Sequence, residues 1–429
     1  MGQKVPACLD LFRSAAFKSM LRWTGQLGPV AAFLPKAATS LTASSSTEAK
    51  GLMRIALVTE FYYPHLGGVT EHVHNLAKAY NAAGQPTIVV TSNMRMPTGT
   101  PDAHEYEKDE DFVRRLGTSR IIYSSGSFAR ITTGWRLRRQ LRDLFRREQV
   151  DIVHVHGGLA PTFGIIAPLA ASDLGIPVVT TFHSWFAKSY ALQFWRRQAN
   201  WLLGYHAANI AVSKPVVEAH ARYVQADWEI IPNGVDTAFF QPNGRTPAAP
   251  EVQHPKLLFL GRLDPRNGLE TVLRAMPAVL GRFPRTRLTI AGDGPLRPLY
   301  ERLARPVAEH VDFLGRVNGN RPEVYGSADL YLCPTTKASF GITLLEAMAC
   351  GTPLVVSDIT GFRELVAGDS EAVLVDKDDA TAWAQATIDL LADPGRRSEM
   401  RSAGLAKAQT FAWPRVAEQV FAVYQRVTK

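Results

Sequence analysis

The feature that most constrains the fold is a pattern of short apolar, β-rich runs separated by helical stretches, which occurs twice along the chain. Strands that alternate with helices form parallel sheets whose two faces are covered by those helices. Each series therefore predicts a doubly wound, Rossmann-like α/β sheet. The first series comprises residues 55–58, 88–90, 152–156, 178–182 and 210–212, and the second comprises residues 256–260, 288–291, 311–314, 330–333 and 354–357.

Chain length and a turn-rich junction at residues 231–236 predict where the domains lie. With 429 residues and 46% apolar content, the chain is long enough for two hydrophobic cores. We expect a first domain at residues 53–236 and a second at residues 237–412. A final helix, apolar on one side, is expected at residues 413–427.

Residues 1–52 differ from the rest of the chain. They contain six Lys or Arg against Asp10 and Glu48, and they end in a polar, serine-rich run. A loose helical stripe of apolar residues there could lie on a membrane surface. The simpler expectation is a disordered extension, and a start site at Met53 is an equally good explanation.

Charge and cysteine content restrict the class of protein. The net charge of +9 suits an anionic partner, such as a nucleotide sugar or an acidic lipid surface. Nucleic acid is disfavoured because no motif of interleaved aromatic and basic residues accompanies the charge. Cys8, Cys333 and Cys350 are scattered, so neither a disulfide framework nor a zinc site is indicated. No apolar run is long enough to span a membrane.

Two segments have the form of anion-binding helix starts. Gly67-Gly68 follows a strand and opens a helix, where missing side chains let phosphate oxygens approach backbone N–H groups. Two glycines alone fit an ordinary tight turn equally well. The second segment, residues 339–353, is a turn followed by a helix that carries Glu346 among apolar residues. A helix start can bind phosphate, and a carboxylate can accept hydrogen bonds from sugar hydroxyls, so this segment predicts a sugar-nucleotide site.

A polar loop with two arginines, Arg262 and Arg266, follows the first strand of the second series. Open α/β sheets bind ligands at this carboxyl edge, and a guanidinium can neutralise a diphosphate. Arginines in a polar loop are also common on a solvated surface.

Residues 339–353 resemble the donor signature of family 4 retaining glycosyltransferases, with Glu346 as its second glutamate and Ala338 at the position of the first. The resemblance implies a GT-B fold, in which two Rossmann-like domains face each other across a cleft and the last helix returns to the first domain. It implies no metal and no cofactor, with a GDP- or UDP-linked sugar as donor. It also implies Arg262 and His183 as catalytic residues, although a lone histidine at a strand end is usually structural. The implied donor-binding residues are Gly67, Gly68, Arg266, Gly292, Arg316, Val317, Ser339, Phe340, Gly341, Ile342, Thr343, Leu344 and Glu346.

Within that family, residues 53–427 resemble bacterial phosphatidylinositol mannosyltransferases. Shared features include Gly67-Gly68-Val69, the segment 127–130, the segment 182–184 and the junction at 231–236. The resemblance implies that Ser127, Arg130 and Lys188 bind the acceptor at its inositol phosphate. Asn267 and Ala338 depart from the family pattern, and both departures bear on the donor sugar.

An arginine-rich stretch at residues 130–147 alternates with apolar and aromatic residues. Such a basic amphipathic helix favours a membrane-surface element over a solvated helix whose apolar side is packed. His154 and His156 alternate on one strand and are interpreted as structural.

The resulting expectation is a hexosyltransferase that uses a lipid acceptor and lies at the cytoplasmic face of the cell membrane. Three alternatives stay open: a transferase of polysaccharide or other glycoconjugate assembly, a catalytically silent sugar-nucleotide-binding homologue, and a phosphorolytic or epimerase relative.

Overall fold

The computed structural model describes residues 52–65, 67–94, 111–124, 127–159, 162–242, 254–317, 319–366 and 368–429, without the side chains of residues 122–129. The expectations for residues 1–51 lie outside this part of the chain. Residues 52–429 form one unit with two β-sheets. In the described residues no helix is both long and apolar enough to cross a membrane.

The first sheet has eight strands in the order β4-β3-β2-β1-β5-β6-β7-β8. All neighbouring strands are parallel except the edge pair β3–β4, which is an antiparallel hairpin. The strands are β1 (Ile55–Thr59), β2 (Thr87–Asn93), β3 (Val113–Ser124), β4 (Ser127–Thr133), β5 (Ile152–His156), β6 (Val178–Phe182), β7 (Ala208–Ala211) and β8 (Trp228–Ile230). Its helices are α2 (Gly68–Ala82), α3 (Leu137–Arg147), α4 (Phe163–Ser172), α5 (Tyr190–Phe194), α6 (Arg196–Leu203) and α7 (Lys214–Ala221).

The second sheet has six parallel strands in the order β11-β10-β9-β12-β13-β14. They are β9 (Lys256–Leu260), β10 (Arg287–Ala291), β11 (Val311–Gly315), β12 (Leu330–Cys333), β13 (Leu354–Ser357) and β14 (Val373–Val375). Its helices are α8 (Leu269–Arg282), α9 (Arg297–Leu303), α10 (Arg321–Ser327), α11 (Ile342–Ala349), α12 (Thr360–Arg363), α13 (Ala380–Ala392) and α14 (Pro394–Thr410), with 3-10 turns at Pro265–Asn267 and Arg305–His310. The prediction of two Rossmann-like sheets is confirmed.

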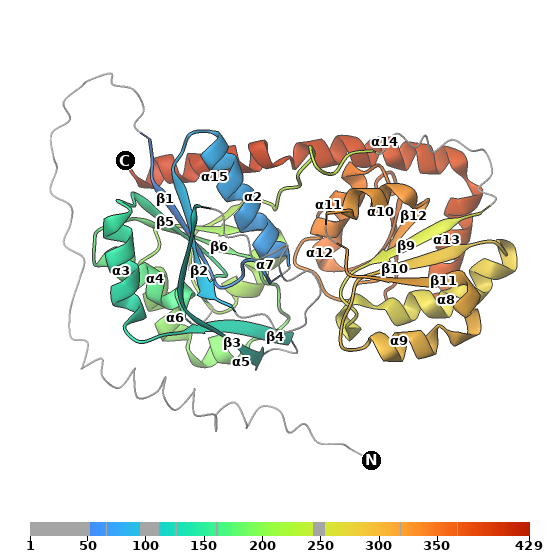
Figure 1. Ribbon diagram of the computed structural model, residues 1–429, viewed down its shortest axis with the longest axis horizontal. Helices are drawn as coiled ribbons and strands as arrows, with labels where there is room; N and C mark the ends of the chain where they lie inside the picture. Colours follow the sequence, from blue (N-terminus) through green and yellow to red (C-terminus); the bar gives the residue numbers. More distant parts are fainter. Residues whose placement is uncertain are drawn as a thin grey trace, which may run out of the picture. The chain divides into compact units, whose positions relative to one another are not determined.

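The last helix, α15 (Trp413–Val427), packs against α2 and the first sheet, although the chain reaches it from the second sheet (Figure 1). Its apolar side contributes Val416, Val420 and Tyr424 to the core formed with β1 and α2. The Tyr80 hydroxyl donates to the Ala417 carbonyl at 3.0 Å. The chain thus passes twice between the two sheets.

The arginine-rich stretch is not one helix. Arg130 lies on β4, and α3 begins only at Leu137. The apolar residues of α3 are buried in a core that also contains Phe163 and Ala167 of α4. The apolar side of α3 is therefore covered by protein, as expected for the alternative interpretation of a solvated helix whose apolar side is packed.

Candidate functional site

The two predicted anion-binding helix starts meet. A Cβ atom placed on Gly68, the first residue of α2, would lie 2.9 Å from Cδ1 of Ile342, the first residue of α11. Gly341 precedes α11 with a φ of 122°, and a Cβ there would lie 2.6 Å from the Leu344 side chain. Glycine is therefore required at this turn. Two positive helix ends converge on one region, which favours an anion there.

Cations from both sheets lie near this turn. Burial, together with the smaller effects of the Arg130 and Arg262 charges, lowers the pKa of His65 to about 4. His65 Nε2 would lie 3.8 Å from a Cβ placed on Gly67. The Arg262 side chain is half-exposed, and its Nε is 3.1 Å from Asp264 Oδ2. Arg262, of the second sheet, and Arg130, of the first, are thus close enough to one histidine to affect its charge.

Arg266 and Asn267 hold the loop that carries Arg262. Arg266 Nε donates to the Lys337 carbonyl at 2.9 Å, next to Ala338. Asn267 Nδ2 donates to the Arg262 carbonyl at 2.7 Å. The asparagine therefore fixes the backbone of Arg262 at the position where the resembled family carries a lysine. The Arg266 guanidinium is partly used for loop structure.

Glu346 is held by protein groups. Its side chain is 3% exposed, and it accepts hydrogen bonds from Arg321 Nη1 at 2.7 Å and from the Tyr325 hydroxyl at 2.9 Å. Burial raises its pKa, and the charge of Arg321 opposes that rise. Arg321 Nη2 also lies 3.4 Å from Glu71 Oε1 on α2. A ribose that contacts Glu346 must share or displace these partners. No motif around Arg321 or Glu71 pointed to this pairing.

His183 lies in a buried group with His72 and His156. His156 Nδ1 and His183 Nε2 are 3.3 Å apart, and the rings of His72 and His183 are 4.8 Å apart. Burial keeps the pKa of His183 well below its usual value, so the imidazole is neutral at physiological pH. His72 Nδ1 is 2.8 Å from Asn233 Oδ1. One ring nitrogen from each of the three histidines lies within 4.8 Å of the others, a set that could hold a metal ion.

His154, in contrast, uses both ring nitrogens in structural hydrogen bonds. Nδ1 is 2.5 Å from the Tyr424 hydroxyl, and Nε2 is 2.7 Å from Thr181 Oγ1. His154 therefore joins β5 to α15 and β6, whereas His156, two residues later, faces the group that contains His183.

Several predicted donor-binding residues have structural contacts. Ser339 Oγ accepts from the Trp185 N–H at 2.9 Å, and its carbonyl accepts from Ser213 Oγ at 2.7 Å, which links the two domains. Phe340 and Leu344 are buried in the core. The Leu344 N–H donates to the Gly341 carbonyl at 3.0 Å, so this N–H is already used within the turn. The N–H groups of Ile342 and Thr343 have no acceptor in the described part of the chain.

The remaining donor-side positions lie at the carboxyl ends of β10 and β11. Gly292 has a φ of 139°, and a Cβ there would lie 1.9 Å from the Gly261 carbonyl oxygen, so only glycine fits. Arg316 is exposed, with its Nε 3.7 Å from Asp293 Oδ2. Val317 is partly buried. These positions therefore lie at the same edge of the second sheet as Arg262.

The predicted acceptor residues lie on the first domain. Ser127 begins β4 and pairs with Ser124 across the hairpin, and its side chain is outside the described residues. Arg130 Nη1 donates to Ser119 Oγ at 3.1 Å. Lys188 is exposed and lies two residues before the start of α5. In the described residues, no hydrogen bond or ion pair joins Arg130 to Lys188.

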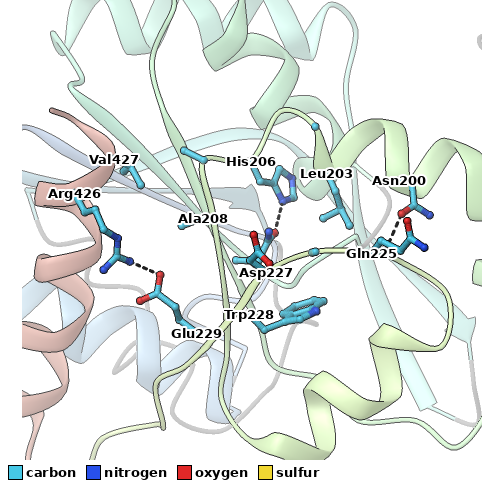
Figure 2. A pocket seen from close by; sticks show the side chains of 14 residues that line it. Asn200, Leu203, His206, Ala208, Gln225, Asp227, Trp228, Glu229, Arg426 and Val427 are labelled. Atoms are coloured by element: carbon cyan, nitrogen blue, oxygen red, sulfur yellow. Dashed lines mark hydrogen bonds and ion pairs between the residues drawn. The ribbon is translucent and has the colours of Figure 1, made fainter.

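A pocket of about 410 Å³ lies elsewhere, between α6, β7, β8 and the end of α15 (Figure 2). Arg426 pairs with Glu229 at one side of it, and His206 Nδ1 is 2.9 Å from Asn209 Oδ1. None of the predicted donor or acceptor residues lines this pocket. It is distinct from the site at Gly68 and Ile342.

Comparisons with known proteins identify the family. The family described as Glycosyltransferase Family 4 matches residues 66–239, and the family described as Glycosyl transferases group 1 matches residues 254–393. The chain is 33% identical over 382 residues to a phosphatidyl-myo-inositol mannosyltransferase of Mycolicibacterium smegmatis, which covers 88% of this chain and 94% of the relative.

Solved structures show the same fold at lower identity. A glycosyltransferase of Rickettsia africae has a TM-score of 0.69 and 17% identity, covering 88% of this chain and 99% of that one. Anabaena HepE in complex with UDP-glucose has a TM-score of 0.68 and 19% identity, covering 87% and 100%. The two sheets form a GT-B fold, and the chain belongs to the family 4 glycosyltransferases.

Proposed function

We propose that this glycosyltransferase moves a hexose such as mannose from a nucleotide sugar to a lipid acceptor, with phosphatidylinositol as the first candidate, and that it retains the anomeric configuration. The observation that carries the proposal is the meeting of Gly68 with Ile342. The charge of Arg262 is near enough to His65, in the adjoining turn, to lower its pKa. Two helix starts and a guanidinium form a suitable place for the donor diphosphate.

The residues at this place account for the chemistry without a protein nucleophile. As the bond between sugar and phosphate breaks, negative charge grows on the departing diphosphate. Arg262 and the N–H groups of Ile342 and Thr343 stabilise that charge, because they are fixed in position before the reaction. The acceptor oxygen bonds to the anomeric carbon on the face that the phosphate leaves, and the departing phosphate takes the acceptor proton, so the configuration is retained.

The relatives suggest two classes of sugar donor. The relative from M. smegmatis is named a mannosyltransferase, and the Anabaena structure contains UDP-glucose. Both GDP- and UDP-linked hexoses are therefore candidates, and we propose that transfer requires no metal. Ala338 lacks a carboxylate for sugar hydroxyls, so the hexose is held by other groups.

A transfer assay tests the proposal. Purified protein is incubated with GDP-mannose or UDP-glucose, with and without EDTA, and with phosphatidylinositol vesicles or a soluble glycan acceptor. We expect glycolipid by mass spectrometry and an α linkage by NMR, unaffected by EDTA. Product on the glycan alone would support glycoconjugate assembly instead, and a β linkage would contradict retention.

One observation favours a second candidate, a catalytically silent homologue that binds sugar nucleotide. Arg321 already pairs with Glu346, while Ala338 and Asn267 both depart from the family pattern. Nucleotide binding by calorimetry, without transfer or hydrolysis of any donor tried, would support this alternative. Phosphate-dependent or acceptor-free turnover would instead indicate the phosphorolytic or epimerase relative.

A further inference from the structure

The segment 184–206, between β6 and β7, has an unusual composition. It contains seven aromatic residues and three Lys or Arg, and it has no Asp or Glu. Aromatic residues together with basic residues are typical of protein surfaces that lie at a membrane interface. The segment folds as α5 and α6, whose exposed side we call the α5–α6 surface.

The aromatic side chains on the α5–α6 surface are exposed. Tyr190 is 73% exposed, Phe194 is 74% exposed and Trp201 is 48% exposed. None of the five residues of α5 is buried, and α6 buries only Ala199, Leu202 and Leu203. Large aromatic side chains at such exposure leave substantial apolar area in water. These three rings therefore contribute little to the core under the first sheet.

The basic residues of this surface have no acidic partner. Lys188, Arg196 and Arg197 are all exposed, and the described residues form no ion pair with them. On α3, by comparison, Arg138 forms a 2.6 Å ion pair with Asp173, and Arg139, Arg142 and Arg146 share one acidic neighbour, Asp143, within 3.9 Å. The α5–α6 surface therefore combines exposed rings with cations that have no ion pair in the described residues.

We propose that the α5–α6 surface docks on an anionic phospholipid membrane. Tyr190, Phe194 and Trp201 enter the interface, while Arg196 and Arg197 contact the headgroup phosphates. This inference rests on the proposed function, since Lys188, a predicted acceptor residue, lies two residues before the start of α5. Docking by this surface would place the acceptor side of the first domain at the lipid.

Vesicle binding tests the proposal without any transfer step. Full-length protein is sedimented with vesicles of phosphatidylcholine alone or mixed with phosphatidylglycerol, an anionic lipid that is not the proposed acceptor. We expect binding to the anionic vesicles, weakening as salt rises. Tyr190→Ser/Phe194→Ser should lower the partition coefficient by at least about tenfold, and Arg196→Ser/Arg197→Ser by roughly 30-fold.

Two charge-matched variants serve as controls. Arg282→Ser/Arg285→Ser removes two exposed cations of the second domain, and Arg139→Ser/Arg146→Ser removes two from α3. Both should leave binding within about threefold of wild type. Melting temperature and nucleotide binding of each variant show that it is folded.

The outcomes separate this inference from the proposed function. If only the α5–α6 variants lose vesicle binding, the result supports membrane docking by this surface, whether or not transfer to phosphatidylinositol is found. The inference would be overturned if the wild-type protein did not bind anionic vesicles. It would also be overturned if the α3 variant lost as much vesicle binding as the α5–α6 variants. A wild-type dimer that Tyr190→Ser/Phe194→Ser converts to monomer, with vesicle binding unchanged, would show that a second copy covers these rings instead.

Discussion

The guanidinium of Arg321 lies 2.7 Å from the carboxylate of Glu346 and also contacts Glu71, so one arginine joins the donor-side helix α11 to α2 of the first domain. Glu346 is 3% exposed, and the ring of Phe240 lies 5.1 Å from the Arg321 guanidinium carbon. A charge buried in this way is costly unless its partner is present.

Arg321→Leu should therefore destabilise the protein. It leaves the Glu346 carboxylate buried with only Tyr325 as a partner, and breaking such a pair costs about 3 kcal/mol of unfolding free energy. Urea denaturation measures the change. Arg274→Leu, which removes an exposed i,i+4 pair with Glu270, is the control and should cost no more than about 0.5 kcal/mol. Equal losses in both variants would show that the Arg321 pair has no special role.

Gly68→Ala should weaken nucleotide binding by about tenfold, or about 1.4 kcal/mol, because the new methyl group occupies the approach of phosphate to the backbone. The methyl would also lie 2.9 Å from Ile342 Cδ1. Gly68→Ala/Ile342→Val removes that contact. Calorimetry should show that the double variant still binds nucleotide weakly. The control Gly281→Ala, where a Cβ meets no atom within 4 Å, should bind nucleotide as the wild type does. Full rescue by Ile342→Val would mean that the glycine serves packing alone.

Glu60 should make the protein less stable as pH rises. Burial raises its pKa from the ordinary 4.5 to about 8, and its Oε1 accepts a hydrogen bond from the Phe163 N–H at 2.7 Å. Between those two pH values the folded state holds a proton that the unfolded state has lost, so unfolding free energy falls with increasing pH. Relative to Glu60→Gln, wild type should lose stability from pH 4.5 to 8. A parallel pH profile in the two proteins would contradict the raised pKa.

The ten β-rich runs of the sequence all overlap observed strands, because buried parallel strands produce continuous apolar runs. The helix at 413–427 matches α15, and the helix expected to open at Gly67-Gly68 is α2, which begins at Gly68. The β3–β4 hairpin was missed, since Arg114, Arg115 and Gly117 interrupt its apolar pattern. Edge strands face water on part of their surface and carry a weaker signal.

The candidate site was predictable where glycines and helix starts determine it, and unpredictable where distant side chains meet. Glu346 was expected to be available to ribose, yet it pairs with Arg321, 25 residues away in sequence. Ser339 was expected at the donor, yet it bonds Trp185 and Ser213 of the other domain. Such contacts depend on how the two sheets pack, which local sequence patterns do not contain.

Ala338→Glu should change donor choice more than it changes turnover. A carboxylate there can accept sugar hydroxyls, and a charge-assisted hydrogen bond contributes about 1.5–3 kcal/mol. We expect a lower KM for the preferred hexose and a kcat within a few-fold of wild type, measured across GDP- and UDP-linked donors. Transfer that appears only in the Ala338→Glu variant would identify the wild-type chain as a silent homologue.

The most direct test of the central claim is the single-turnover rate of Arg262→Ala. If Arg262 stabilises the departing diphosphate, the rate of transfer should fall by at least about 100-fold, while the affinity for nucleotide changes only a few-fold. Arg316→Ala, an exposed arginine at the neighbouring strand end, should mainly weaken nucleotide binding. An Arg262→Ala variant that transfers sugar at the wild-type rate would contradict the account.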